Sequence, residues 1–148
     1  MDDLEGIKNY RKLSDTVATA GQPRERDFPL MAKSGYQVVI NLGLADAEYA
    51  LPDERGLVER LGLKYVHIPV EWKAPTAADL NEFMSAIDAC GDKKLFIHCA
   101  ANKRVSVFMA LYRIKRLGWS YDEALRDVNK TWTPDAVWQQ FINQMISR

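Results

Sequence analysis

The hydrophobic positions of this chain fall into short continuous runs, separated by segments with helical spacing. Three runs, at 37–42, 64–70 and 94–98, are largely apolar without alternation, which is typical of strands buried on both faces of a sheet. Residues 17–20 predict a fourth strand, at an edge of that sheet. Because strand and helix patterns alternate, the sequence predicts an α/β fold with a mostly parallel sheet of four to five strands, flanked by helices.

Residues that begin or end helices mark the segments between these runs. Segments 27–34 and 53–61 each stop before a glycine, which is the common residue after the last helical turn. Thr76 and Asp79 have the spacing of a capping box, and the apolar residues that follow recur on one helical face. We therefore expect a helix between each pair of successive strands.

The C-terminal half of the chain is predicted to be helical and to cover one face of the sheet. Apolar residues occur on nearly all sides of segment 105–114, which indicates a central, buried helix, with Arg113 expected on a solvated face. A second capping box spans 120–123, and Thr133–Pro134 predicts the start of a final helix with proline in its first turn. No repeat or linker interrupts the pattern, so residues 1–148 are interpreted as a single domain.

Composition and charge exclude several classes of partner. Twenty basic residues balance twenty acidic ones, so bulk charge gives no reason to expect a nucleic acid or a membrane surface as partner. No apolar run approaches the ~20 residues of a membrane span, and the N-terminus resembles no signal peptide, which favours a cytoplasmic protein. The two cysteines are too few for a disulfide framework, and His67 and His98 are too far apart for a metal-ligand motif. We expect neither a metal nor another cofactor.

The most informative segment is 94–106, where a strand ends in His98-Cys99 and a loop of small residues leads into the long helix. Backbone N–H groups converge where a strand meets a helix N-terminus, and the helix dipole there is positive, so the position favours anions. The same field stabilises a thiolate and can lower a cysteine pKa from about 8.5 to well below 7. Cys99 is therefore interpreted as a nucleophile rather than as a buried core cysteine, which is the interpretation for Cys90.

At these residues the sequence resembles the cysteine-dependent protein tyrosine and dual-specificity phosphatases, whose signature is His-Cys, five residues, Arg, then Ser or Thr. Segments 19–23, 35–42 and 65–70 extend the resemblance. Together they look like a small bacterial branch of that superfamily, of largely unassigned function, over roughly residues 16–117. The resemblance implies a phosphatase-like fold and phosphoryl transfer that needs no metal or organic cofactor.

The family signature is altered by one position in this chain. Cys99 and Ser106 stand at the family spacing, but Val105 occupies the position of the Arg, and Arg104 comes one place earlier. Either the loop is one residue shorter and Arg104 binds phosphate, or the loop keeps its length and the ligand is lost. We favour the first alternative, because a bidentate cationic group is what an oxyanion site most needs. Rhodanese-type sulfurtransferases also have a six-residue loop from Cys to Arg.

The resemblance implies a role for each residue of the loop. Asn102 stands where the family usually has glycine, and Asn tolerates the left-handed conformation better than most residues. Ser106 either donates to the thiolate or is a small packing residue, and His98 either orients the loop or is a structural histidine. The implied phosphate-binding residues are Ala100, Ala101, Asn102, Lys103, Arg104 and Ser106.

A general acid is needed to protonate the leaving oxygen. In the family an Asp on the loop after the third strand does this, but the corresponding loop here, 70–75, has no Asp. Glu71 is its available carboxylate and is the candidate acid, the alternative being a solvated loop charge. Trp72 either lines the pocket or covers the edge of the sheet.

These residues together predict a cytoplasmic phosphatase with a phosphocysteine intermediate at Cys99. Its partner would be a phosphorylated protein or a small-molecule phosphomonoester. Two alternatives remain open. A catalytically silent module that binds a phosphorylated ligand fits the displaced Arg104 and the missing Asp, and a rhodanese-like sulfurtransferase with a Cys99 persulfide fits the loop length.

Overall fold

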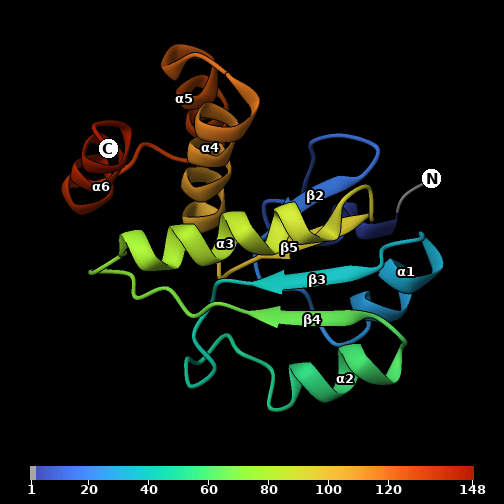
Figure 1. Cartoon of the computed structure of the whole chain (residues 1–148). Coiled ribbons are helices and arrows are strands. Elements are labelled where there is room, and N and C mark those ends of the chain that lie inside the picture. The colour runs from blue at the N-terminus through green and yellow to red at the C-terminus, as the bar shows by residue number, and fades with distance from the viewer. Residues whose placement is uncertain (1–2) are drawn as a thin grey trace.

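The computed structural model describes residues 3–148, and one five-stranded sheet forms its centre (Figure 1). The strands lie in the order β1-β2-β5-β3-β4, with β1 antiparallel to β2 and all other neighbours parallel. The predicted α/β fold with a mostly parallel sheet is confirmed. The strands are β1 (Arg11–Lys12), β2 (Val17–Ala20), β3 (Val38–Asn41), β4 (Lys64–His67) and β5 (Leu95–His98).

Helices cover both faces of the sheet and enclose two hydrophobic cores. Alternate side chains of β3 and β5 point to one face, where α3 and α4 pack, with α5 and α6 packed against α4 in the same core, and α1 and α2 pack on the other face. The helix α4 is buried along most of its length, as its apolar pattern predicts. The helices are the 3-10 helix η1 (Asp3–Gly6), α1 (Asp27–Lys33), α2 (Glu54–Arg60), α3 (Ala77–Cys90), α4 (Lys103–Leu117), α5 (Tyr121–Asn129) and α6 (Ala136–Ile146).

Two strands occupy places that differ from the prediction. The strand β2 is not at the edge, because the two-residue strand β1, which has no apolar pattern, pairs along its outer side. The two edges of the sheet are instead β1 and β4, and in β4 Lys64 is exposed and His67 is half-buried. The apolar run 64–70 is therefore not buried on both faces as a strand. Its last apolar residues, Ile68 and Val70, lie beyond the strand and pack into the core.

The helix boundaries follow local capping signals. Both predicted capping boxes are present, at the N-termini of α3 and α5. The last helix begins later than predicted, because the carboxylate of Asp135 accepts the N–H of Trp138 and so caps α6. Pro134 consequently precedes the helix and is not in its first turn.

Arg113 is not on a solvated face, contrary to the prediction from its helix pattern. The residue is buried, and its Nη1 donates to Asp127 Oδ2 at 2.6 Å. Asp127 also accepts from Arg11 Nη2 at 2.9 Å, so the carboxylate joins β1, α4 and α5. A buried guanidinium is tolerated here because it has an ionised partner within hydrogen-bond distance.

Parallel pairing brings the C-terminal ends of four strands, β2, β5, β3 and β4, to one edge of the sheet. Asn41 pairs in register with His98 on one side and with His67 on the other. Each of these strands leads into a loop at this edge, and Cys99 is the first residue after β5. Open α/β sheets bind ligands outside the carboxyl ends of their strands. The fold therefore places Cys99 where a site is expected.

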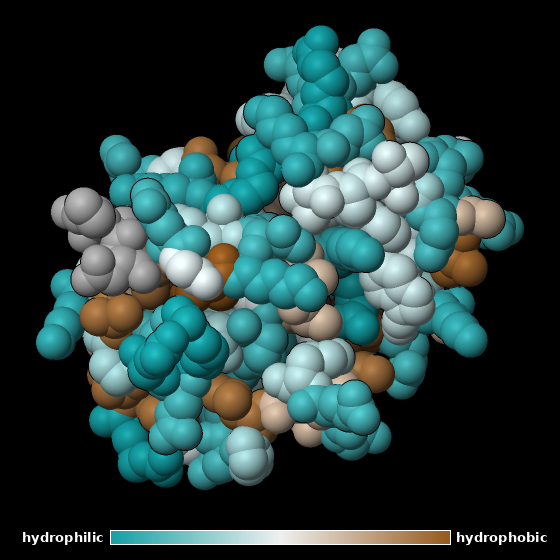
Figure 2. Space-filling model, turned by 180° about the vertical axis from the view of Figure 1, so that it is seen from behind, coloured by the Kyte–Doolittle hydropathy of each residue, from teal (hydrophilic) through white to brown (hydrophobic). Residues whose placement is uncertain are grey.

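Seen from behind, the molecular surface is mostly hydrophilic, and apolar residues show only as small separate groups (Figure 2). No helix within residues 3–148 combines the length and apolar character needed to cross a membrane. The large apolar side chains that are exposed in this part of the chain are Leu117, Tyr121, Val137 and Ile146.

Candidate active site

Cys99 is a buried residue that lines a small cavity at the end of β5. The residue is 1% exposed, and the cavity has a volume of about 210 Å³. The N–H of Cys99 donates to the carbonyl of Ala20 at 3.3 Å, which ties the start of the loop to β2. The lining residues are Trp72, Cys99, Ala100, Ala101, Lys103 and Arg104. The structure thus brings most of the site residues that the sequence suggests into one cavity with Trp72.

The loop after Cys99 rests on the end of β2. The N–H of Gln22 donates to the carbonyl of Ala100 at 3.0 Å, and Gly21 forms an isolated bridge with Ala101. A Cβ atom on Gly21 would lie 2.6 Å from the Ala100 oxygen, so only glycine permits this approach. The segment around Gly21 therefore supports the loop.

Asn102 forms the turn between the loop and α4. Its φ of 66° lies in the left-handed region, in agreement with the expectation for an Asn in the place of glycine. Its Nδ2 donates to the carbonyl of Asn9 at 2.9 Å and to Thr19 Oγ1 at 3.0 Å. Asn9 Nδ2 donates in turn to the carbonyl of Ala101 at 2.9 Å. These bonds hold the turn, and with it the direction of the N–H groups at the start of α4.

Arg104 lies in the first turn of α4 and lines the same cavity. It is 6% exposed, and its Nε is buried without a hydrogen-bond partner. Its Nη1 donates to Tyr49 Oη at 3.5 Å, and its guanidinium carbon lies 5.5 Å from the centre of the Trp72 ring. No carboxylate within residues 3–148 forms an ion pair with it. A buried cation without a counter-ion, at the positive end of a helix, is costly. The arrangement therefore favours a bound anion.

Lys103 and Ser106 differ in how they face the cavity. Lys103 lines it, and its ammonium group lies 5.5 Å from the centre of the Trp132 ring. Ser106 does not line it, because its hydroxyl donates to the carbonyl of Lys103 at 2.6 Å and accepts from Trp132 Nε1 at 3.0 Å. The Ser106 proton is thus directed at the helix backbone rather than at Cys99.

Glu71 lies on the loop after β4. The next residue of this loop, Trp72, lines the cavity. The carbonyl of Trp72 accepts from Trp138 Nε1 at 2.9 Å, and its ring packs against Trp132 and Trp138. The Glu71 side chain is exposed and does not line the cavity. The structure therefore brings this loop to the site but leaves the candidate acid in solvent.

Tyr49 joins the site from the loop after β3, and no sequence signal identifies it. Its hydroxyl accepts the N–H of Leu44 at 2.9 Å and is the atom that Arg104 contacts. Gly43 leaves room for this ring, since a Cβ there would lie 3.0 Å from Tyr49 Cε1. Only the tertiary structure brings Tyr49 to a residue 55 positions away.

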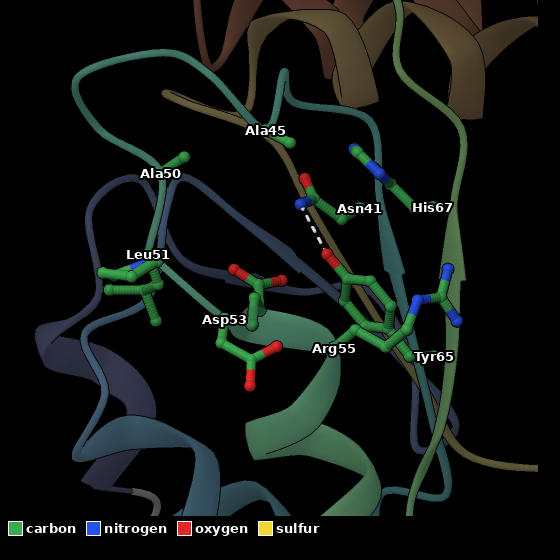
Figure 3. A pocket seen from close by; sticks show the side chains of 10 residues that line it. Asn41, Ala45, Ala50, Leu51, Asp53, Arg55, Tyr65 and His67 are labelled. Atoms are coloured by element: carbon green, nitrogen blue, oxygen red, sulfur yellow. Dashed lines mark hydrogen bonds between the residues drawn. The ribbon is translucent and has the colours of Figure 1, made fainter.

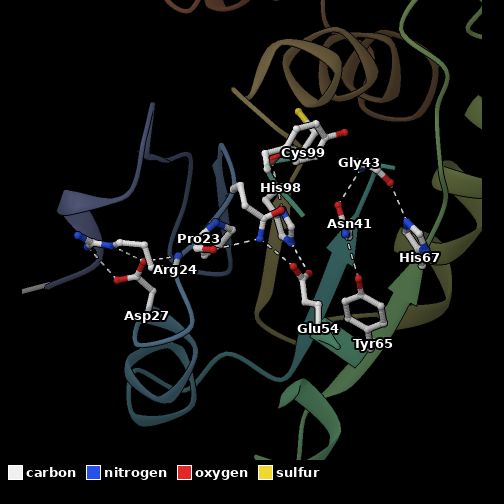
Figure 4. Close-up of polar contacts among 12 residues, drawn as sticks. Pro23, Arg24, Asp27, Asn41, Gly43, Glu54, Tyr65, His67, His98 and Cys99 are labelled. Carbon is white, nitrogen blue, oxygen red and sulfur yellow. Dashed lines mark hydrogen bonds and ion pairs between the residues drawn. The ribbon is translucent and has the colours of Figure 1, made fainter. Parts of the chain in front are cut away.

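The side chains of Cys99 and His98 point to opposite sides of β5 (Figure 4). His98 Nε2 lies 2.6 Å from Glu54 Oε2, both residues are buried, and Glu54 Oε1 accepts from Gln22 Nε2 at 2.8 Å. Burial alone would raise the pKa of Glu54. The charge and hydrogen bond of His98, with hydrogen bonds from Gln22 and Tyr65, outweigh burial and lower that pKa. Glu54 is therefore an ionised carboxylate, and sequence reasoning did not identify it.

A second cavity, of about 200 Å³, lies at the C-terminal ends of β3 and β4 (Figure 3). Asn41 Nδ2 donates to Tyr65 Oη at 2.9 Å, and the Arg55 guanidinium lies 5.0 Å from the centre of the Tyr65 ring. Glu54 also lines this cavity, so one carboxylate contacts both His98 and the second cavity. Within residues 3–148, three or more His, Cys, Asp or Glu side chains are nowhere grouped as they would be around a metal ion.

Residues 5–144 match the profile of the family described as "DSP-PTPase phosphatase fused to NAD+ Kinase". The chain belongs to this family. A DUF442 protein from Shewanella putrefaciens CN-32, described as a candidate phosphatase, is 32% identical in sequence. Its structure superposes with a TM-score of 0.87, covering 98% of this chain and 93% of that chain. The resemblance to the cysteine-dependent tyrosine and dual-specificity phosphatases is thereby confirmed.

Two further proteins are similar to this DSP-PTPase family member. The beta-lactamase hydrolase-like protein of Xylella fastidiosa (strain Temecula1) is 30% identical over 105 residues, which cover 69% of this chain and 24% of that protein. The chain thus spans about a quarter of the length of the curated relatives it matches. The catalytic domain of the PP-IP phosphatase SIW14 from S. cerevisiae shares the fold, with 18% identity and a TM-score of 0.77 over 94% of this chain and 86% of that chain.

Proposed function

We propose that the protein hydrolyses phosphomonoesters through a phosphocysteine intermediate at Cys99, on a phosphorylated protein or on a small molecule. The buried guanidinium of Arg104 carries this proposal, because its Nε has no partner in the cavity that it shares with Cys99. A phosphate oxygen would supply that partner. Membership of a phosphatase family supports the same class of reaction.

The reaction would proceed in two displacement steps at phosphorus. In the first, the Cys99 thiolate attacks, a sulfur–phosphorus bond forms, and the bond from phosphorus to the leaving oxygen breaks. The backbone N–H groups of residues 100–104 and the guanidinium of Arg104 would stabilise the charge on the three remaining oxygens. In the second step, water attacks phosphorus and the sulfur–phosphorus bond breaks, which releases inorganic phosphate and regenerates the thiolate.

Glu71 would protonate the leaving oxygen in the first step and accept a proton from water in the second. Its side chain is exposed, whereas the adjacent Trp72 lines the cavity. Either substrate binding brings this loop closer, or the leaving group departs as an anion. Aryl phosphates, whose leaving groups are weak bases, are therefore expected to react faster than alkyl phosphates.

A rhodanese-like sulfurtransferase is the second candidate, and it is favoured by a cavity lining without a carboxylic acid. Transfer from thiosulfate needs no acid. The Cys99 thiolate would attack the outer sulfur, the sulfur–sulfur bond would break, and sulfite would leave as an anion, with a persulfide left on Cys99. A nucleophile such as cyanide would then take the outer sulfur as thiocyanate.

The deciding experiment measures three properties of the purified protein: hydrolysis of an aryl phosphate, binding of inorganic phosphate, and formation of thiocyanate from thiosulfate and cyanide. Hydrolysis that is lost in Cys99→Ser and retained in Cys90→Ser supports the phosphatase. Full turnover by Cys99→Ser contradicts the covalent mechanism. Phosphate binding without turnover indicates a phospho-ligand-binding module, and thiocyanate formation without hydrolysis indicates the sulfurtransferase.

A further inference from the structure

His98 and Glu54 form a buried pair directly behind the loop of Cys99. Their side chains are 0% and 6% exposed, and His98 Nε2 lies 2.6 Å from Glu54 Oε2 (Figure 4). The other ring nitrogen, Nδ1, lies 3.4 Å from the carbonyl oxygen of Cys99. The imidazole ring therefore connects a carboxylate on α2 with the backbone of the candidate nucleophile.

Both ring nitrogens of His98 face hydrogen-bond acceptors. A carboxylate oxygen lies next to Nε2 and a backbone carbonyl oxygen lies next to Nδ1. A neutral imidazole has one N–H group, whereas an imidazolium has two. Only the charged ring can donate to both neighbours.

The proton in the hydrogen bond between Glu54 and His98 is not held by a neutral carboxyl group of Glu54. Burial favours the neutral form, but His98, Gln22 and the hydroxyl of Tyr65 all hydrogen-bond to the carboxylate, and its pKa is lowered as a result. A carboxyl group that accepts three hydrogen bonds is stabilised in its ionised form. The proton between Glu54 and His98 thus belongs to the ring.

Within residues 3–148, the other elements packed around the pair add no unpaired anion. Lys103 and Arg104 of α4 face the Cys99 cavity with positive charge, and the Arg55 guanidinium lies over the Tyr65 ring. Phe28 of α1 meets the His98 ring edge-on, and Asn41 of β3 lies beside His98 in register, both without charge. The nearby buried carboxylate of α1, Asp27, is paired with Arg24.

We propose that Glu54 is a positioning residue that keeps His98 doubly protonated and so places a fixed positive charge behind Cys99. The pair is neutral as a whole, but its positive end is nearer the nucleophile, because His98 precedes Cys99 and Glu54 lies beyond the ring on α2. Such an oriented pair favours negative charge on the sulfur and on a bound anion. The effect on the sulfur rests on the proposed function, whereas the charge of His98 is measurable without any substrate.

Nitrogen NMR of the histidine rings tests the charge directly. The chain has only two histidines, so the variant His67→Gln assigns both sets of ring signals. At about pH 7, His98 should show two protonated ring nitrogens in the wild type and one in Glu54→Gln. A wild-type His98 ring with a single protonated nitrogen overturns the proposal, and this measurement does not depend on whether the variant folds.

Alkylation of Cys99 by iodoacetamide at about pH 6 gives the second readout, with Cys90 in the same molecule as the internal reference. The reaction at Cys99 should be several-fold slower in Glu54→Gln. The matched control is Asp53→Asn, which removes the neighbouring charge from a side chain that is 68% exposed and keeps a residue that caps α2 equally well. Equal slowing in both variants overturns the proposal. If the wild type neither binds phosphate nor turns over, the proposed function fails, while the ring spectra still decide the state of His98.

Discussion

The hydroxyl of Tyr49 lies 3.5 Å from Nη1 of Arg104, and it also accepts the N–H of Leu44 at 2.9 Å. The loop after β3 thereby reaches the cation of the Cys99 cavity. The guanidinium is held from a second side by Trp72, whose ring centre lies 5.5 Å from the guanidinium carbon. This orientation matters because arginine binds a phosphate group through a planar fork of N–H donors.

Replacing Tyr49 with Phe removes the hydroxyl and keeps the ring. We expect the affinity for inorganic phosphate to fall by about 0.5–1.5 kcal/mol, the usual net contribution of one hydrogen bond, because Arg104 loses an acceptor that orients it. The affinity is measured as the phosphate concentration that half-protects Cys99 from alkylation. Tyr121→Phe, on the exposed surface of α5, is the control. Identical protection curves for both variants would show that Tyr49 does not orient the cation.

Replacing Arg104 with Lys retains the charge but removes the bidentate fork. The variant should lose on the order of 2–3 kcal/mol of transition-state stabilisation, a value scaled from the loss of a single preorganised donor. Arg104→Ala should lose more. The measurement is kcat/KM with an aryl phosphate, and Arg116→Ala, on the exposed part of the same helix, is the control. Near-normal rates in both Arg104 variants would mean that the loop binds phosphate through its backbone alone.

The parts of the fold that could be predicted are those that are encoded locally. The runs 37–42 and 94–98 became strands because their apolar residues are buried on both faces, and Thr76 begins a helix because it caps the N-terminus of α3. The strand β1 has only two residues and no apolar pattern, so local spacing does not predict it. The edge position of β4 depends on pairing between distant strands, about which local spacing carries no information.

The same distinction applies to the site. Cys99 and Arg104 could be identified because a single continuous segment joins a strand end to a helix N-terminus. Tyr49 and Glu54 reach that segment from the loop after β3 and from α2, through contacts that only the tertiary structure creates. The burial of Arg113 is likewise invisible in the pattern of its own helix, because its partner Asp127 lies on another helix.

Asp127 is expected to make the stability of the protein depend on pH. Burial would raise the pKa of Asp127, but the hydrogen bonds and charges of Arg11 and Arg113 lower it. Because the pKa in the folded state is below that in the unfolded state, the stabilisation is complete above the unfolded pKa and is lost as the pH falls through the folded pKa. We expect Asp127→Asn to lower the free energy of unfolding by about 1–3 kcal/mol near neutral pH, and by less in acid.

Urea unfolding followed by tryptophan fluorescence, from about pH 7 to about pH 3, measures this dependence. The control is Asp88→Asn, which removes a pair with Arg116 whose side chains are 44% and 41% exposed. Such an exposed pair should contribute less than about 1 kcal/mol. A loss in Asp127→Asn that is equally large at every pH would contradict the ionic origin of the effect.

Glu71 is best tested by the dependence of the rate on the leaving group. A poor leaving group such as an alkyl alkoxide needs a proton as its bond to phosphorus breaks, whereas an activated nitrophenolate departs as an anion. If Glu71 is the general acid, Glu71→Gln should therefore slow the alkyl phosphate far more than the nitrophenyl phosphate, and the basic limb of the pH–rate profile should flatten. The matched control is Glu82→Gln, an exposed carboxylate on α3.

The Glu71 side chain lies in solvent and outside the cavity lining. If each substrate reacts at the same rate in Glu71→Gln as in the wild type, Glu71 is a loop charge and not the general acid. Protonation would then come from water, and the protein would be restricted to substrates with acidic leaving groups.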